Sequence, residues 1–522
     1  MFEFRKSRWA RSAVTGAMAT AIAAAVLPAA TAAARTPGPP PVPERYTAQK
    51  LAWQPCRQGD SLECARMKVP RDWYHPGTGE DLTIAVSRQR ASDPARRRGV
   101  LMMAAGGPGG QGLPRPATLV KKSPEIGAAY DVVSFDQRGV GQSSRVRCET
   151  DAEFQGYFDG DSRDRSPAAV RRELDNARKF VDSCRERSGD LMNYITTDQT
   201  VHDMDLYRAL LGEKKVSYYG PSYATVIGAY YATEFPQRVE RVVLDSNIDF
   251  TGTWEGHEKG QPLSFQRRFE QDFLPWLAKN DGTYHYGSTA AEARAKYEKL
   301  RRQLRDHPLP IAGGKALVDP NRLDSVVISV MYNGENFPGL AKSLAVLDHW
   351  DRATAEEKAM IDKGFGQSPS ADFFAEFFSV TCADTPWNRD IGQWTKSAAE
   401  DSGKYPLAGA RELTYTAVCA NWPEAGAPQI KVTGKGLPPV LMVNGRHDPA
   451  TYYEGAVRAH RALRGSRLVT VDGGDHGQYQ DGSACVDSVV NDYLLKGTMP
   501  SHDITCEGAP LPSLSREAGR NG

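Results

Sequence analysis

The stretch "KKVSYYGPSYATVIGAYYA", residues 214–232, decides the fold. Its first part is an apolar, aromatic run typical of a buried strand, and its last part is a run of small residues typical of a helix. The two meet at Gly220-Pro221-Ser222 without a connecting loop, so the turn must be tight and strained. A serine hydroxyl is a weak nucleophile that must be presented to a base, and a strand-to-helix elbow exposes it. We therefore predict that Ser222 is a nucleophile.

Strands and helices alternate on both sides of this elbow. One of the helices, "VHDMDLYRALLG" at residues 201–212, is closed by Gly212. This alternation predicts a mostly parallel central sheet with helices on both faces. Buried strands are predicted over residues 99–105, 130–136, 215–219, 241–246, 439–445 and 467–473.

The rhythm changes to helical patterns over residues 251–431, for example in "AEARAKYEKLRRQLRDH". So long an excursion between two strands predicts a separate helical subdomain. We therefore expect a first core segment at 51–250, a helical cap insertion at 251–431 and a second core segment at 432–522.

The first 34 residues have the layout of a secretory signal peptide, because basic residues precede an Ala-rich run that ends in Ala-x-Ala patterns. We expect a secreted, extracellular protein with no membrane anchor once this signal is cleaved. Residues 35–50 are Pro-rich and are expected to form an extended tether or a pro-segment. Eight cysteines in an exported chain are expected to form disulfides, although their connectivity does not follow from the residues alone.

The overall charge excludes some classes of partner. The chain has 65 basic and 64 acidic side chains, so its net charge is +1 and no field favours nucleic acid or an anionic membrane. It contains no C-x-x-C or H-E-x-x-H pattern, and we expect neither a metal nor a cofactor. The oligomeric state is not predicted.

Two further reactive residues follow predicted strands. Asp448 follows "PVLMVNGRH" and His476 follows "RLVTVDGGD". The order Ser, Asp, His is that of the α/β-hydrolase triad. In this scheme His476 takes the proton of Ser222, and Asp448 orients the imidazole. Three other residues compete for the role of the acid: Asp245, Asp472 and Asp475.

The glycine-rich run "AAGGPGGQG" at residues 104–112 follows the first predicted strand. It satisfies G-x-G-x-x-G formally, but Pro108 and Pro114 oppose the helix that a dinucleotide site requires. We expect Gly107 to donate one backbone N–H to a reaction oxyanion, and Tyr223 to donate the second. A plain tight turn is the alternative.

Taken together, "AAGGPGGQG", "DVVSFDQRGVGQSS", "VLDSNID", "VLMVNGRHDPAT" and "LVTVDGGDHGQY" resemble the secreted tripeptidyl aminopeptidases, α/β-hydrolases related to prolyl iminopeptidases. The resemblance covers nearly the whole mature chain. It implies an α/β-hydrolase fold with a helical cap, the triad Ser222, Asp448 and His476, and an exopeptidase that removes short peptides, often tripeptides, from free N-termini. It also implies four disulfides: Cys56 with Cys64, Cys148 with Cys184, Cys382 with Cys419, and Cys485 with Cys506.

This chain departs from the pattern at two positions. Ala224 stands where G-x-S-x-G has its second glycine, and Ala105 stands where prolyl iminopeptidases have histidine. Neither change removes catalytic chemistry, but both weaken the analogy with the prolyl iminopeptidase substrate.

An exopeptidase must bind a protonated amine, so we expect acidic residues of the cap to face the cleft. Glu335 and Asp384 are the candidates, and solvated surface carboxylates are the alternative for each. A secreted esterase or amidase acting on small acyl substrates would use the same triad. A catalytically silent binding protein is a third possibility, against which an intact triad argues.

Overall fold

The computed structural model describes residues 41–367, 370–424 and 426–513. The expected signal peptide lies outside the described residues, as does the start of the expected tether. The last part of that tether is not extended. Helix α1 (Glu44–Thr47) buries Tyr46, whose hydroxyl donates to Asp81 Oδ1 at 2.6 Å. The folded part therefore begins before Leu51, because burial of this aromatic ring stabilises the segment against the core.

The core is a ten-stranded sheet within the described part of the chain. All six predicted strands belong to it, together with four that were not predicted. The first strands in the sheet order pair antiparallel, and every pair from β5 onward is parallel, so the prediction of a mostly parallel sheet is confirmed. The strand order is β1 (Gln54–Pro55), β2 (Glu63–Val69), β3 (Leu82–Gln89), β5 (Tyr130–Phe135), β4 (Gly99–Met103), β6 (Val216–Pro221), β7 (Val239–Asp245), β10 (Val440–Gly445), β11 (Arg467–Asp472) and β12 (Ile504–Glu507).

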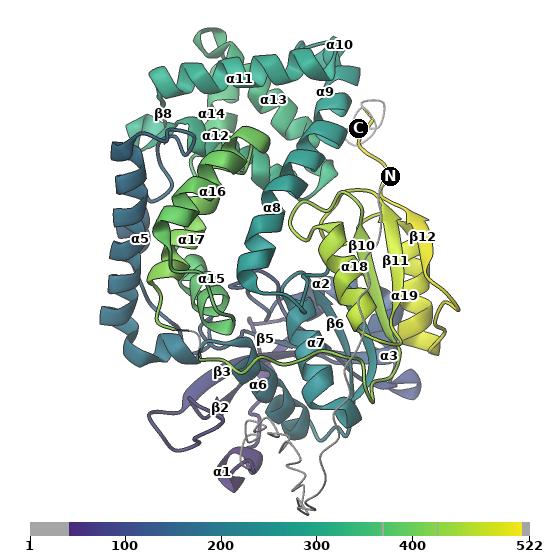
Figure 1. The fold of residues 1–522 in the computed structure, drawn as a ribbon. Helices are drawn as coiled ribbons and strands as arrows, with labels where there is room; N and C mark the ends of the chain where they lie inside the picture. Colours follow the sequence, from purple (N-terminus) through teal and green to yellow (C-terminus); the bar gives the residue numbers. More distant parts are fainter. Residues whose placement is uncertain (1–40, 368–369, 425, 514–522) are drawn as a thin grey trace, which may run out of the picture. The chain divides into compact units, whose positions relative to one another are not determined.

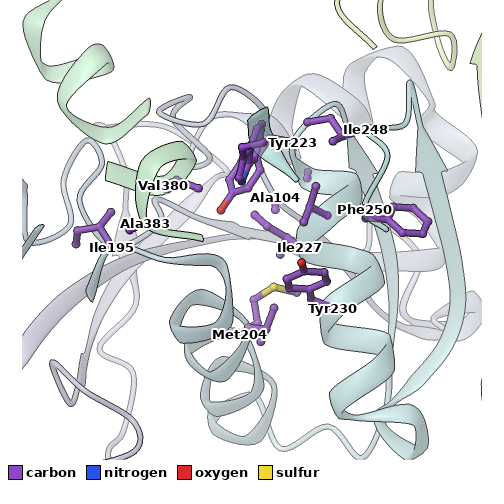
Figure 2. Packing of buried hydrophobic residues seen from close by; sticks show 14 of the residues in the cluster. Ala104, Ile195, Met204, Tyr223, Ile227, Tyr230, Ile248, Phe250, Val380 and Ala383 are labelled. Carbon is purple, nitrogen blue, oxygen red and sulfur yellow. The ribbon is translucent and has the colours of Figure 1, made fainter. Parts of the chain in front are cut away.

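Helices cover both faces of the sheet, because the central strands are apolar on both sides. Along β7, Val243 faces one hydrophobic cluster while Val242 and Leu244 face the other. Figure 2 shows part of the second cluster, where Met204 and Tyr230 lie close together. The first face is covered by α2 (Arg115–Lys122), α3 (Pro124–Ala129) and α19 (Ala484–Lys496), and the second by α6 (Thr197–Leu210), α7 (Ala224–Glu234) and α18 (Tyr453–Ala462).

The segment between β7 and β10 is helical, as expected for the cap, and has a hydrophobic cluster of its own. Large aromatic side chains such as Phe269 and Phe273 fill that cluster. One short hairpin, β8 (Leu309–Ile311) with β9 (Ala316–Val318), interrupts the helices. Three cap helices lie near the candidate active site described below: α8 (Trp254–Arg268), α15 (Ala371–Asp384) and α17 (Glu412–Asn421).

One helix of the expected core packs with the cap. Helix α5 (Pro167–Ser188) lies along α17, and Figure 1 shows the two side by side. Its buried Phe180 contacts Phe378 of α15, with 5.4 Å between the ring centroids. Just before it, Asp161 accepts a hydrogen bond from Arg301 at 2.6 Å. The apolar face of α5 therefore packs partly against the cap and partly against residues such as Phe154 of the expected core segment.

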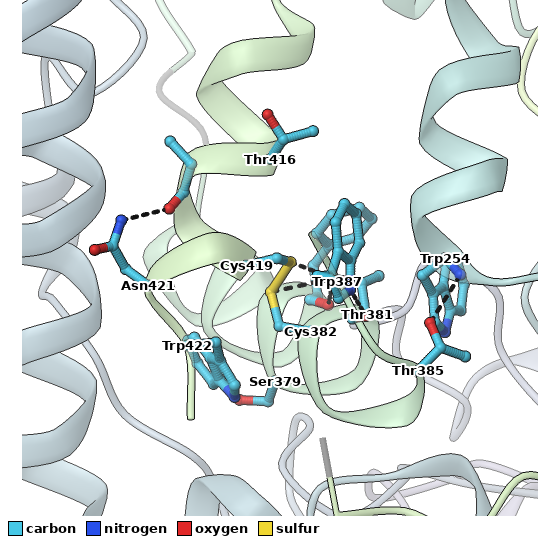
Figure 3. Close-up of a disulfide and its surroundings, with 12 residues drawn as sticks. Trp254, Ser379, Thr381, Cys382, Thr385, Trp387, Thr416, Cys419, Asn421 and Trp422 are labelled. Atoms are coloured by element: carbon cyan, nitrogen blue, oxygen red, sulfur yellow. Dashed lines mark hydrogen bonds between the residues drawn. A yellow bond between two sulfur atoms is a disulfide. The ribbon is translucent and has the colours of Figure 1, made fainter. Parts of the chain in front are cut away.

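All eight cysteines form disulfides, in the four pairs that the family resemblance implies. Figure 3 shows the bond between Cys382 and Cys419, which joins α15 to α17 within the cap. Cys148–Cys184 fixes the end of α5, and Cys485–Cys506 links α19 to β12.

Candidate active site

Ser222 lies in the turn between β6 and α7, as the sequence predicts. Its φ of 60° is in the left-handed region, which costs free energy for a serine. The turn is held by the Ser222 N–H, which donates to the Asp245 carbonyl at 2.9 Å, and by the Thr225 N–H, which donates to the Ser222 carbonyl at 2.8 Å. A strained residue that the surroundings hold in place is typical of a functional site.

His476 and Asp448 are in direct contact. His476 Nδ1 lies 2.9 Å from Asp448 Oδ1 and 3.1 Å from Oδ2. Asp448 is buried and also accepts the backbone N–H groups of Ala450 and Thr451, at 3.0 and 2.9 Å. An imidazole that donates from Nδ1 to a carboxylate keeps the lone pair of Nε2 free to act as a base.

The pair is arranged so that the acid stays ionised. Burial raises the pKa of Asp448, but the charge and hydrogen bond of His476 outweigh it, so the pKa lies below its ordinary value. Burial lowers the pKa of His476, but the charge and hydrogen bond of Asp448 outweigh it, so that pKa lies above its ordinary value. The imidazolium is thus the form that this environment stabilises.

The competing acids have other partners. Asp245 accepts the backbone N–H groups of Gln478 and Tyr479, each at 3.0 Å, and so holds the loop that carries His476. Asp475 pairs with Arg268, and Asp472 pairs with Arg446. Of the four aspartates considered, only Asp448 is hydrogen-bonded to His476 within the described residues.

The glycine-rich loop approaches the nucleophile closely. A Cβ atom at Gly106 would lie 2.9 Å from Ser222 Cβ, so only glycine fits there. Among the described residues, the backbone N–H groups of Gly107 and Tyr223 have no hydrogen-bond acceptor. Unpaired donors beside a strained serine are suited to bind an oxyanion, and we keep both as candidates for that role. The close approach of Gly106 was not predicted.

Ser222, His476 and Thr451 line one cavity of about 610 Å³, together with Gly106, Gly107 and Gly110 of the glycine-rich loop. An aromatic wall from the cap faces them, made by Phe373, Phe374 and Phe377 of α15 and Tyr415 of α17. The charged residues of the lining, besides His476, are Arg115, Lys122, Arg411 and Asp481. The cavity therefore combines an apolar wall with several charges.

The two carboxylates predicted to bind a substrate amine lie in different places. Asp384 does not line the cavity. It is buried, and it accepts the Thr197 N–H at 2.8 Å and the Trp254 indole N–H at 3.2 Å. Burial raises its pKa to about 7. Its carboxylate is occupied inside the protein, so the structure does not bring it to the cleft.

Glu335 is exposed and does not line the cavity either, but it lies near a carboxylate that does. The pKa of Asp481 is raised to about 7, mainly by burial and then by the charge of Asp475. The charge of Glu335 makes a smaller contribution in the same direction. Sequence reasoning missed Asp481, although it lies in the same loop as His476. Sequence reasoning also missed Arg411. The sequence has no local signal for this residue, because the packing of the cap brings it to the cavity.

No group of metal-ligating side chains occurs in the described part of the chain. Nor does any helix among residues 41–367, 370–424 and 426–513 have the length and apolar character to cross a membrane.

A mostly parallel sheet, with a serine elbow after β6 and an aspartate–histidine pair after β10 and β11, defines an α/β-hydrolase. Residues 405–506 match the family model described as TAP-like protein. The chain is 34% identical to the tripeptidyl aminopeptidase of Streptomyces lividans, over 88% of this chain and 87% of the relative. The chain belongs to this TAP-like family of α/β-hydrolases and is a serine hydrolase.

Two other relatives are at the same level of coverage. The serine protease Hip1 of Mycobacterium tuberculosis is 30% identical over 88% of this chain and 91% of its own. A protein named carboxylesterase B from the same organism is 30% identical over 91% of this chain and 92% of its own. Names of peptidases and of an esterase thus occur at similar sequence distance.

Proposed function

We propose that the protein is a secreted serine exopeptidase that releases short peptides, tripeptides among them, from free N-termini through an acyl-enzyme on Ser222. The observation that carries the proposal is the contact of His476 with Asp448, at a cavity whose wall also contains the strained Ser222. The relatives named tripeptidyl aminopeptidase and serine protease support peptide substrates. Four disulfides support an oxidising compartment.

The proposed mechanism uses the groups of this cavity in turn. Ser222 Oγ attacks the scissile carbonyl carbon while His476 Nε2 takes its proton, and Asp448 stabilises the imidazolium. The carbonyl oxygen becomes an oxyanion that accepts the N–H groups of Tyr223 and Gly107. The imidazolium then gives its proton to the leaving amine. Water attacks the resulting ester, again deprotonated by His476, and releases the peptide acid.

Recognition of a free N-terminus requires a negative charge in or beside the cavity. We propose that Asp481, supported by Glu335, binds the substrate ammonium. Asp481 is the one carboxylate among the described cavity-lining residues. The Asn333 amide donates to both of its oxygens, at 3.1 and 3.2 Å, and fixes their orientation. A bound ammonium would favour the ionised form that burial otherwise disfavours.

The test compares Ala-Pro-Ala anilides with free and with acetylated N-termini, using the purified protein and its Ser222→Ala variant. We expect cleavage of the free-amine anilide only, with loss of activity in the variant. Asp481→Asn should raise KM for the free-amine substrate. Activity that survives Ser222→Ala would show that Ser222 is not the nucleophile.

A secreted esterase or amidase acting on small acyl substrates, with the same triad, is the second candidate. The aromatic wall of α15 favours it, because an apolar acyl chain could pack against Phe373 and Phe377. A short-chain acyl ester in the same assay separates the two functions. Turnover of the ester alone would reject the peptidase proposal and leave the triad proposal intact.

A further inference from the structure

The cavity contains arginines that have no carboxylate partner. Neither Arg115 nor Arg411 forms an ion pair within the described residues, although both line the same cavity as Ser222. The third cation, Lys122, lies near Asp481 and acts to lower its pKa, so it has an acidic neighbour. Both residues are half-buried. Charged groups that lose contact with water are usually paired, and two guanidinium groups without an ion pair therefore need an explanation.

Arg411 comes from the cap, directly before α17. Its guanidinium lies 4.8 Å from the ring centroid of Tyr415 and 5.6 Å from that of Phe265, so two aromatic faces hold it. Its charge also acts on Tyr332, whose ring centroid is 5.1 Å from that of His476. Arg411 therefore lines the same cavity as the proposed base, and Tyr332 is a neighbour of His476 on which its charge acts.

Arg115 comes from the core, at the start of α2. The one hydrogen bond of its guanidinium within the described residues runs from Nε to the Gln111 carbonyl, at 3.3 Å. Burial lowers its pKa, and the groups that act against this are the phenols of Tyr219 and Tyr218, not a carboxylate. Tyr219 lies three residues before Ser222 and lines the cavity. A desolvated guanidinium in this position would be stabilised by a bound anion.

We propose that the cavity selects substrates that carry a carboxylate near the scissile bond, and that Arg411 and Arg115 bind it. The inference rests on the proposed function in one respect, namely that substrates are cleaved at Ser222. A guanidinium presents paired N–H donors that match the two oxygens of a carboxylate. The carboxylate could belong to an acidic side chain or to the C-terminus of a short peptide, and both have this chemistry.

A buried acid on which the charge of Arg411 acts offers a competing explanation. Glu258 of α8 is buried, and its carboxyl forms no hydrogen bond within the described residues. Burial raises its pKa to about 7, and the charge of Arg411 acts to lower that pKa. No ion pair joins the two within 4 Å in the described part of the chain. If Arg411 served only to neutralise Glu258, its loss would be corrected by removing that carboxylate.

The experiment measures kcat/KM for matched substrates. One set is tripeptide anilides with Asp or Asn at each position in turn, and a second is tetrapeptides with a C-terminal carboxylate or amide. A charge-assisted hydrogen bond predicts a preference of about tenfold or more for the carboxylate at one position. A preference in the first set would mean that the bound carboxylate belongs to a side chain. A preference in the second set would mean that it belongs to the C-terminus.

Three substitutions then test the assignment. The preference should disappear in Arg411→Gln and in Arg115→Gln, and Arg411→Lys should retain part of it. Arg461→Gln, which removes an exposed arginine of α18, should keep the wild-type ratio. The proposal would be overturned if the wild type showed no preference in either set, cleaving Asp and Asn anilides equally and C-terminal carboxylates and amides equally. Recovery of Arg411→Gln by Glu258→Gln would also overturn it.

A failure of the peptidase proposal can be told apart from a failure of the arginine proposal. If no anilide or peptide is cleaved, acyl esters that end in a carboxylate or in the isosteric amide replace them. A carboxylate preference among these esters would support the two arginines while rejecting the peptidase. Cleavage of peptides without any such preference would reject the arginines alone.

Discussion

The interaction between His476 and Asp448 determines the pH above which the proposed base is neutral and able to accept a proton. His476 must be neutral to accept the Ser222 proton, and its pKa lies above the ordinary value of 6.5 because Asp448 outweighs the effect of burial. The value of kcat/KM should therefore rise with pH through a pKa above 6.5. The acid enters the reaction by holding the tautomer and stabilising the imidazolium.

Asp448→Asn should lower kcat by about 10³–10⁴-fold, because the amide no longer enforces the Nδ1–H tautomer. The ascending limb of the pH profile should also move to lower pH, since the charge that raises the His476 pKa is gone. Steady-state kinetics between pH 5 and pH 9 measure both effects. Asp472→Asn, at an exposed residue that pairs with Arg446, is the control. An unshifted limb in Asp448→Asn would contradict the assigned contact.

At the scale of elements, the elbow depends on close packing of α7 against β6. A Cβ atom at Gly228 would lie 2.3 Å from a Tyr218 ring carbon and 2.8 Å from Leu244 Cδ2. Gly228→Ala should therefore destabilise the fold by about 1–3 kcal/mol, through overpacking. Chemical denaturation measures this free energy of unfolding.

The matched control is Gly339→Ala on the cap helix α13 (Phe337–Asp348). Nothing lies within 4 Å of the position of its Cβ atom. That substitution should be neutral or should stabilise by up to about 1 kcal/mol, because alanine restricts the unfolded chain. Equal effects of the two substitutions would show that the α7 contact is not tight.

The disulfide Cys382–Cys419 should matter for substrate binding, because it joins α15 and α17, which both contribute to the cavity wall. Its loss should raise KM, and the chain-entropy model gives about 4 kcal/mol of lost stability for a loop of this length. Replacement of both cysteines by alanine, followed by kinetics and thermal melting, tests this. Cys56–Cys64 links the residue after the edge strand β1 to strand β2, and its removal should leave KM unchanged. A rise in KM in the second variant would mean that the effect is not local.

Elements could be predicted from sequence where the pattern is local. Strand β6 and the turn at Ser222 follow from an apolar run that ends at glycine and proline, and the long buried runs mark the parallel strands. The edge strand β12 has only four residues and was missed. Helix α5 falls within the expected core segment 51–250, because a sequence pattern can show that one face of a helix is buried but not which element it packs against. Arg411 has no local signal, because packing of the cap brings it to the cavity. Asp481 had one, since it lies in the loop that carries His476.

At the scale of the whole molecule, burial of acidic groups makes stability depend on pH. Glu376 of α15 is 1% exposed, and its Oε2 has no hydrogen-bond partner. Burial, with a contribution from Asp384, raises its pKa well above the ordinary 4.5, so the folded protein keeps this carboxyl protonated to higher pH than the unfolded chain does. The unfolded chain ionises it once the pH exceeds that ordinary value. Folding therefore takes up a proton, and the free energy of unfolding falls as pH rises between the two pKa values.

Glu376→Gln should remove this dependence, because the amide is neutral in both states. One proton contributes up to about 1.4 kcal/mol per pH unit, so the variant should gain stability relative to the wild type as the pH rises above the ordinary 4.5. Urea denaturation at three pH values above 4.5 measures the difference. Glu356→Gln, at an exposed residue of α14 (Ala355–Phe365), should leave the slope of stability against pH unchanged. If the free energy of unfolding changed with pH equally in Glu376→Gln and in the wild type, Glu376 would have to be ionised in the folded protein. A partner for its charge would then have to lie close by.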